Sequence, residues 1–220
     1  MLLLGLDTAT AVTTVGLVRS ASDGTHEILG ERSHRDPRRH GEVLPVLIGE
    51  VLRASGAAPS DLGTIAVGVG PGAYTGLRVG LATAHALGLA LQIPVHGMST
   101  LDLLAFDTHR TEPFAIVTDA RRREHFWATY SRFDQARSDP TVGTPDAARV
   151  ALAGLDVVCP PGTPAIDGLA MYQGADPSAA ALCEVVLHRL EAGLGTGAPT
   201  ACYLRSPDVM PASTPKSVLS

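Results

Sequence analysis

Residues 70–80 constrain the fold of this chain more than any other segment. The buried-strand pattern Thr64–Val69 runs directly into Gly70-Pro71-Gly72-Ala73-Tyr74-Thr75-Gly76-Leu77-Arg78-Val79-Gly80, and a long helix is predicted from Thr75 or Gly76 to about Leu91. Glycines permit a tight turn at this point, and the free N–H groups of a following helix can receive an anion. The segment matches neither a P-loop nor a dinucleotide fingerprint. Its spacing therefore favours a strand-to-helix corner and leaves an anion site as the alternative.

The predicted helix carries small residues at every fourth position. Gly76, Gly80, Ala84 and Gly88 fall on one face. Glycine inside a helix costs about 1 kcal/mol relative to alanine, so three of them need a reason. A stripe without side chains lets another element approach closely, either within the chain or from a second subunit. Spacing alone does not decide between these alternatives.

The order of the elements predicts an α/β protein with two units. Residues 1–107 form the first unit, and residues 108–220 form a smaller second unit with a Pro/Gly-rich tail. Strands are predicted at residues 2–7, 12–19, 26–32, 64–69, 93–96, 114–118, 124–133 and 155–159. Helices are predicted at residues 41–54, 76–91, 99–106 and 179–192, and a further helix should begin near residue 144. Both units thus begin with strand, turn and strand.

Composition narrows the class of protein. The 220 residues carry a formal charge of −5, which argues against a dedicated nucleic-acid-binding protein and leaves only a local patch or a partner for such contact. Three scattered cysteines, Cys159, Cys183 and Cys202, fit neither a disulfide framework nor a paired-cysteine metal site. No window has the roughly 18 apolar residues of a membrane span, so we expect a cytoplasmic protein without a membrane contact.

A few polar residues could carry chemistry. Asp7 ends the first strand beside Thr8, where a carboxylate can hold a metal or satisfy nearby backbone amides; the second role is the commoner one. Arg35, Arg38 and Arg39 form one basic loop and Arg121–Arg123 another. We expect both to be solvated surface, with contact to phosphate as the alternative. The sequence has no nucleophile elbow and no zinc-protease motif.

Five segments together resemble the bacterial TsaB (YeaZ) family. They are Asp7-Thr8-Ala9-Thr10, the block 70–80, Gly97-Met98-Ser99-Thr100-Leu101, Asp119-Ala120-Arg121-Arg122 and Tyr203-Leu204-Arg205. The block 70–80 is highly specific, and the matches run from about residue 2 to residue 205 in the family's order. The resemblance implies an actin-like ATPase (ASKHA) fold of two RNase H-like lobes, each a mixed sheet flanked by helices.

The resemblance also implies a function. TsaB is the accessory subunit of TsaD, the metal-holding transferase that makes N6-threonylcarbamoyladenosine beside the anticodon of tRNAs reading codons that start with A. The ATPase TsaE joins that pair. The resemblance therefore implies a scaffold without a cofactor, paired with TsaD or with a second copy of itself, that meets tRNA only through the complex.

One departure from TsaD supports this reading. TsaD and its relatives carry a metal-binding His-x-x-x-His at positions that fall on Thr100 and Leu104. Leucine cannot ligate a metal, and a lone threonine is a poor substitute for imidazole. The sequence thus predicts a degenerate relative that has lost the metal. Its remaining site would be a vestigial anion or nucleotide site, formed by Asp7, Thr8, Gly70, Gly72 and Thr75.

Two other activities stay open at this stage. An active actin-fold ATPase or small-molecule kinase would bind ATP through the block 70–76 and Asp7. A metallopeptidase is opposed by Thr100 and Leu104.

The resemblance also implies a subunit interface. In the TsaB family this interface is formed by the counterparts of helices 41–54 and 76–91. We therefore expect a helical interface in which apolar residues of the first helix pack beside the small-residue stripe of the second. The predicted interface residues are Leu44, Leu47, Val51, Gly76, Gly80, Ala84 and Gly88.

Overall fold

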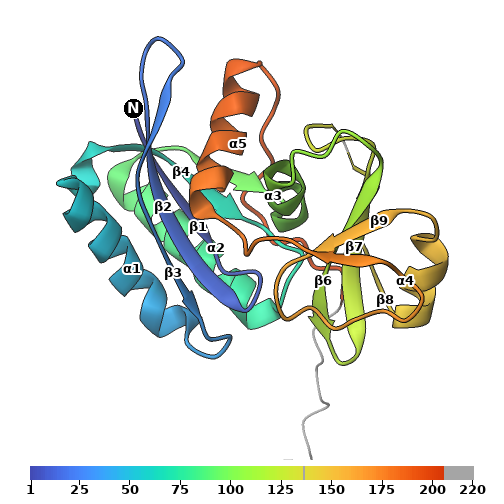
Figure 1. The fold of residues 1–220 in the computed structure, drawn as a ribbon. Helices are drawn as coiled ribbons and strands as arrows, with labels where there is room; N and C mark the ends of the chain where they lie inside the picture. Colours follow the sequence, from blue (N-terminus) through green and yellow to red (C-terminus); the bar gives the residue numbers. More distant parts are fainter. Residues whose placement is uncertain (136, 206–220) are drawn as a thin grey trace, which may run out of the picture.

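The first lobe is built on a five-stranded mixed sheet. A computed structural model describes residues 1–135 and 137–205. Strands β1 (Leu2–Asp7), β2 (Val12–Ser20) and β3 (His26–Arg35) form an antiparallel meander. Strands β4 (Leu62–Gly68) and β5 (Val95–Met98) run parallel to β1, which gives the order β3-β2-β1-β4-β5 (Figure 1).

Helices cover both faces of this sheet. Helix α1 (His40–Ser55) and helix α2 (Tyr74–Leu91) lie on one face, where Leu4 and Leu6 of β1 point. Helix α5 (Ala179–Glu191) covers the other face, against Leu3. This alternation follows from the two-residue repeat of a strand, and it buries β1 completely apart from its first residue. A short 3-10 helix, η1 (Pro59–Asp61), leads into β4.

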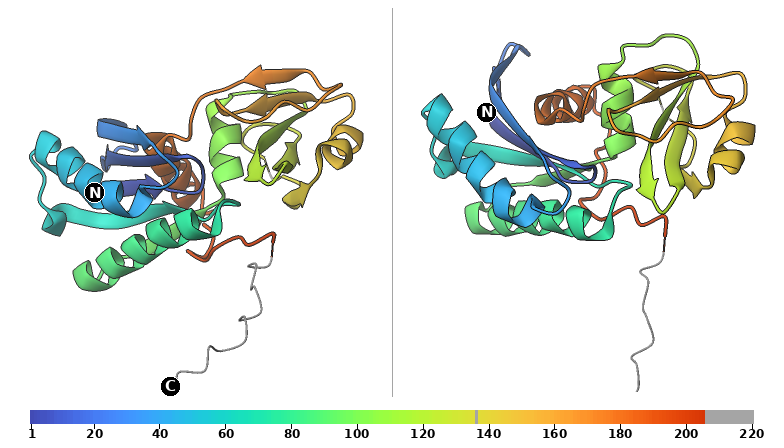
Figure 2. Two further views of the ribbon diagram at one scale, coloured as in Figure 1. Left: turned by 90° about the horizontal axis from the view of Figure 1, so that it is seen from below. Right: turned by 60° about the horizontal axis from the view of Figure 1, so that its bottom comes forward.

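The second lobe repeats the topology of the first. Its strands are β6 (Phe114–Arg121), β7 (Glu124–Tyr130), β8 (Thr141–Gly143), β9 (Asp156–Cys159) and β10 (Met171–Gln173). They are ordered β8-β7-β6-β9-β10, with two antiparallel pairings followed by two parallel ones. Helix α4 (Pro145–Ala151) covers the outer face, and helix α3 (Thr100–Asp107) lies between the two sheets (Figure 2). The predicted two-lobed α/β fold is thereby confirmed.

The predicted boundary at residue 107/108 needs one correction. Helix α5 was assigned to the second lobe, but it packs on the first sheet, where Gly16 lies directly beneath Ala180. The hydroxyl of Ser178 caps the helix and donates to Glu31 of β3 at 2.9 Å. The chain therefore returns to the first lobe after β10.

Residues 196–205, which we call the C-terminal strap, join the two lobes. Gly197 exchanges two backbone hydrogen bonds with Gly97 of β5, at 2.9 and 3.0 Å. The Cys202 amide donates to the Val69 carbonyl at 2.8 Å, and Arg205 then pairs with Glu124 at the start of β7. The strap thus covers the edge of the first sheet and ends on the second lobe. The tail predicted beyond residue 205 lies outside the described residues.

Most predicted elements are confirmed within a few residues. The strands β8 and β10 were missed because each has only three residues, too short for a hydrophobic repeat. Among the described residues, no helix is long and apolar enough to cross a membrane.

Candidate functional site

Asp7 is sealed inside the first lobe. Its side chain has no exposure; one carboxyl oxygen accepts from the Ala9 amide at 2.7 Å and the other from the Thr100 hydroxyl at 2.7 Å. A side chain at Gly68 would collide with this carboxyl group, so the glycine makes room for it. Burial raises the pKa of Asp7, and the two hydrogen bonds only partly oppose that shift. The carboxyl group therefore satisfies its own surroundings and is not presented to a ligand.

Thr8 joins the first strand to helix α2. Its buried hydroxyl donates to the Gly76 carbonyl at 2.7 Å and accepts from the Gly80 amide at 3.1 Å. These are the two groups that an α-helix ordinarily bonds to each other, so the threonine bridges one turn of the helix. A Cβ at Gly80 would lie 2.5 Å from that hydroxyl oxygen, and a Cβ at Gly76 would lie 2.5 Å from the Thr8 carbonyl oxygen. The two glycines are required for this close contact.

The small-residue stripe consequently faces the interior, which corrects the predicted interface. Ala84 has no exposure, and a Cβ at Gly88 would collide with Val95 of β5. The predicted partner residues on α1 are buried as well, with exposures of 0% for Leu44, 7% for Leu47 and 1% for Val51. All seven residues pack within the chain, because the stripe accommodates the sheet and the β1–β2 loop. They are not surface residues that a second subunit could cover.

The loop before α2 closes onto the same region. Gly70 adopts a φ of +90°, and its carbonyl accepts from the Thr100 amide at 2.8 Å. A side chain at Gly72 would strike the Ala9 backbone, while Thr75 is exposed at the start of the helix. The residues of the predicted vestigial site are thus brought together in space. The polar groups of Asp7, Thr8 and Gly70, however, are already hydrogen-bonded to other residues of the chain. The strand-to-helix corner is what the structure supports.

The two positions at which the resemblance implies lost metal ligands lie in different surroundings. Thr100 donates to Asp7, and Leu104 packs in the core of the second lobe against Phe114 and Ile116. Within residues 1–135 and 137–205, no group of three or more His, Cys, Asp or Glu side chains is placed to hold a metal ion.

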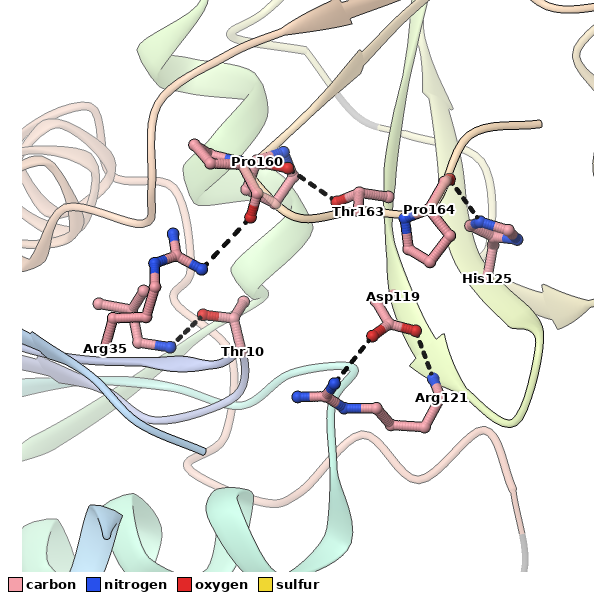
Figure 3. Close-up of polar contacts among 10 residues, drawn as sticks. Thr10, Arg35, Asp119, Arg121, His125, Pro160, Thr163 and Pro164 are labelled. Carbon is pink, nitrogen blue, oxygen red and sulfur yellow. Dashed lines mark hydrogen bonds and ion pairs between the residues drawn. The ribbon is translucent and has the colours of Figure 1, made fainter. Parts of the chain in front are cut away.

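A cleft of about 380 Å³ lies between the lobes (Figure 3). Arg35 of β3 crosses it to donate to the Pro161 carbonyl at 3.3 Å and pairs with Asp176. Arg121, on the other lobe, pairs with Asp119 at 3.1 Å. Both residue pairs line the cleft, so these four charges are paired within it, whereas the Arg38 side chain lines it without a carboxylate partner among the described residues.

His40 lies at the first-lobe wall of this cleft. The residue is 5% exposed, and its Nδ1 lies 2.7 Å from the Thr13 hydroxyl. Burial lowers the pKa of His40, with a smaller contribution in the same direction from Arg121 and an opposing one from Asp36. The imidazole is therefore held neutral and anchors the start of α1.

Sequence reasoning missed how the basic segments combine. Arg38 and Arg121 line one cleft, although they are 83 positions apart, and Arg121 also lines a second cavity with Tyr203 and Arg205. The two arginine runs were visible in the sequence. Their convergence was not, because it depends on how the lobes pack.

Helices α1 and α2 each expose apolar side chains. Leu89 is 83% exposed and Val46 is 56% exposed, and Ala82, Ala86 and Ala90 are exposed beside Leu89. We call this surface the outer helical face. On α2 these exposed residues alternate with the buried stripe of Gly76, Gly80, Ala84 and Gly88.

Comparison with known proteins gives a consistent family. A family model described as "TsaD: tRNA N6-adenosine threonylcarbamoyltransferase" matches residues 27–207. A YeaZ structure from Pseudomonas aeruginosa superposes with a TM-score of 0.72 at 26% identity, covering 92% of this chain and 99% of that one. A second structure from the same organism is described as similar to peptidase YeaZ; it gives a TM-score of 0.73 at 27% identity and covers 93% of this chain and 99% of that chain.

Curated sequences agree with the structures. An uncharacterized protein of Mycobacterium leprae is 39% identical over 213 residues, which are 96% of this chain and 56% of the relative. The tRNA threonylcarbamoyladenosine biosynthesis protein TsaB of Escherichia coli is 35% identical over 136 residues, 60% of this chain and 56% of the relative. The matched segments thus span a little over half the length of these relatives.

Proposed function

Because the chain belongs to the TsaB (YeaZ) family, we propose that it is a non-catalytic subunit in the formation of N6-threonylcarbamoyladenosine in tRNA. In this proposal it pairs with TsaD in the cytoplasm, presents the surface that TsaE joins, and pairs with a second copy of itself when TsaD is absent. The chemistry belongs to TsaD. In this proposal the chain acts as a scaffold that binds the transferase.

The state of Asp7 carries the proposal. Both carboxyl oxygens are occupied by the Ala9 amide and the Thr100 hydroxyl, and the side chain has no exposure. Leu104 is 6% exposed and sits in an apolar core, which offers no ligand atom. A group that activates water or holds a metal needs an open coordination or hydrogen-bonding position. Asp7, Thr100 and Leu104 provide no such open position.

The outer helical face is the proposed contact with TsaD. Exposed apolar side chains such as Leu89 and Val46 are costly in water, and covering them with a partner recovers the hydrophobic free energy. The alanines on α2 allow a partner helix to approach closely. This face replaces the buried stripe that the sequence suggested, on the same two helices.

Substitution of Leu89 tests this contact. Leu89→Asp should abolish binding to TsaD in a pull-down and in size-exclusion chromatography, while circular dichroism stays that of the parent because the side chain is 83% exposed. Val150→Asp is the matched control, since Val150 is 73% exposed on α4 of the other lobe. Retained binding by Leu89→Asp, or equal loss by Val150→Asp, would refute the proposed face.

An active ATPase or small-molecule kinase is the second candidate, and the arginine-lined cleft is the observation in its favour. Calorimetric titration with ATP and magnesium separates the two. Micromolar binding that disappears in Asp7→Asn would favour the enzyme, and absence of binding would favour the scaffold. A metallopeptidase remains opposed by Thr100 and Leu104.

A further inference from the structure

Two cavities open side by side at the junction of the lobes. The inter-lobe cleft of about 380 Å³ and a neighbouring cavity of about 250 Å³ share Ala73 and Arg121 in their walls. The loop before α1, the β6–β7 turn and the C-terminal strap all contribute to this region. We call Arg38, Arg121, Arg122 and Arg123 the basic rim.

Charge is unevenly distributed around this region. The chain as a whole carries −5, yet Arg38, Arg121 and Arg122 line the two cavities, and Arg123 follows Arg122 in the β6–β7 turn. Arg121 pairs with Asp119, whereas the side chains of Arg38 and Arg123 have no carboxylate partner among the described residues. Both are exposed, so their charge is available to a ligand. The neighbouring Arg39 pairs with Glu42 at 2.9 Å and does not share this property.

The β6–β7 turn presents its arginines from an unusual backbone. Arg121, Arg122 and Arg123 adopt φ values of 64°, 54° and 62°, all in the left-handed region. Glycine or asparagine would occupy such a turn at lower conformational cost. Strain of this kind commonly marks a position where the side chains themselves are needed. The turn thus carries three consecutive exposed arginines on a left-handed backbone.

Aromatic side chains lie next to the rim. The rings of Tyr74 and Tyr203 are 5.1 Å apart, and the Arg78 guanidinium lies 4.1 Å from the centre of the Tyr74 ring. Tyr203 is 43% exposed and lines the smaller cavity together with Arg121 and Arg122. Proteins commonly bind single-stranded nucleic acids with this combination: arginines contact the phosphates, and an exposed aromatic ring stacks on a base.

We propose that the basic rim and Tyr203 form a direct contact surface for an RNA single strand or loop, with Arg38 and Arg123 on its phosphates. The inference rests on the proposed function, which supplies tRNA as the RNA. A free nucleotide inside the cleft is disfavoured because the guanidinium groups of Arg35 and Arg121 are already paired with Asp176 and Asp119. Arg38 lines the cleft and Arg123 lies in the β6–β7 turn, both exposed and without a carboxylate partner among the described residues. This subunit would then share tRNA binding with its partner.

Charge reversal tests the contact. The complex of this chain with TsaD and TsaE is titrated with fluorescent unmodified tRNA transcript by anisotropy at several salt concentrations. Arg38→Glu/Arg123→Glu should weaken binding by about tenfold at moderate salt. The slope of log K against log salt concentration should also become less negative by about 1.4, the value expected for the loss of two phosphate contacts to a single strand. Arg19→Glu/Arg149→Glu is the matched control, with the same change in net charge on two exposed arginines elsewhere.

A second pair of variants tests stacking. Tyr203→Ala should weaken tRNA binding at least about fivefold, and Tyr203→Phe should retain it, because phenylalanine keeps the ring and loses only the hydroxyl contact to Arg78 at 3.3 Å.

The outcomes separate the inference from the proposed function. If the complex modifies tRNA but the rim variant binds it like the control, the rim inference is refuted and the proposed function stands. If the rim variant loses ATP binding and keeps tRNA binding, the rim serves a nucleotide and the inference also fails. If the parent complex makes no modified nucleoside, the proposed function itself fails.

Discussion

Replacing Gly80 with alanine should destabilise the chain although alanine is the better helix former. The new Cβ would lie 2.5 Å from the Thr8 hydroxyl oxygen, which cannot retreat because it is bonded to the Gly76 carbonyl. Overpacking costs about 1–3 kcal/mol, and loss of the Gly80 amide bond adds about 1 kcal/mol. The helix propensity of alanine returns about 1 kcal/mol. The net loss is about 2 kcal/mol, or about 4–8 °C in Tm for a chain of this size.

The assay is chemical and thermal unfolding with two companion variants. Gly49→Ala on α1 should be stabilising by about 0.5–1 kcal/mol, because its Cβ meets only the tip of Arg53 at 3.6 Å. In a Thr8→Ala background the cost of Gly80→Ala should shrink, since the clashing oxygen is gone. If Gly80→Ala is as stable as the parent, or its cost is the same without the Thr8 hydroxyl, the packing explanation of the stripe is wrong.

The remaining predictions concern one titrating group and two contacts. The raised pKa of Asp7 means that the folded chain holds this proton more tightly than the unfolded chain, so the group's contribution to stability falls as the pH rises above about 4. Asp7→Asn should therefore gain stability relative to the parent between pH 4 and 7; a constant difference in unfolding free energy across that range would contradict this. Arg205→Glu should speed hydrogen exchange of the strap amides because it breaks the pair with Glu124, and the charge swap Arg205→Glu/Glu124→Arg should return exchange to the parent rate; equal exchange in both variants would disprove the link. Ser178→Ala should cost about 1 kcal/mol in urea unfolding through loss of the α5 cap, and an unchanged midpoint would count against it.

Local patterns in the sequence were sufficient for most of the fold. The alternation of Leu3 with Leu4 and Leu6, and the strand-to-helix corner at Gly70, set the elements of the first lobe before any tertiary contact is considered. The place of α5 could not be read in the same way. Its apolar spacing predicts a buried helix without indicating which sheet it covers, and chain order placed it with the second lobe, whereas it packs on the first.

The candidate site was less predictable than the fold. The stripe from Gly76 to Gly88 was recognised, but a glycine's spacing does not show what lies above it, and here it is Thr8 and Val95 of the same chain. The sealing of Asp7 likewise depends on Thr100, 93 residues away. Contacts of that range follow from packing and leave no mark in local sequence.

The most direct test of the account is an omit-one reconstitution. Purified TsaD, TsaE, the adenylate-forming enzyme, ATP, threonine, bicarbonate and unmodified tRNA are combined with the parent chain, with Asp7→Asn, with Leu89→Asp, or without the chain. Mass spectrometry then counts the modified nucleoside. The account predicts product with the parent and with Asp7→Asn, and loss of product with Leu89→Asp or without the chain. Full product without the chain, or loss of product in Asp7→Asn while TsaD binding is retained, would contradict the claim of a required but non-catalytic subunit.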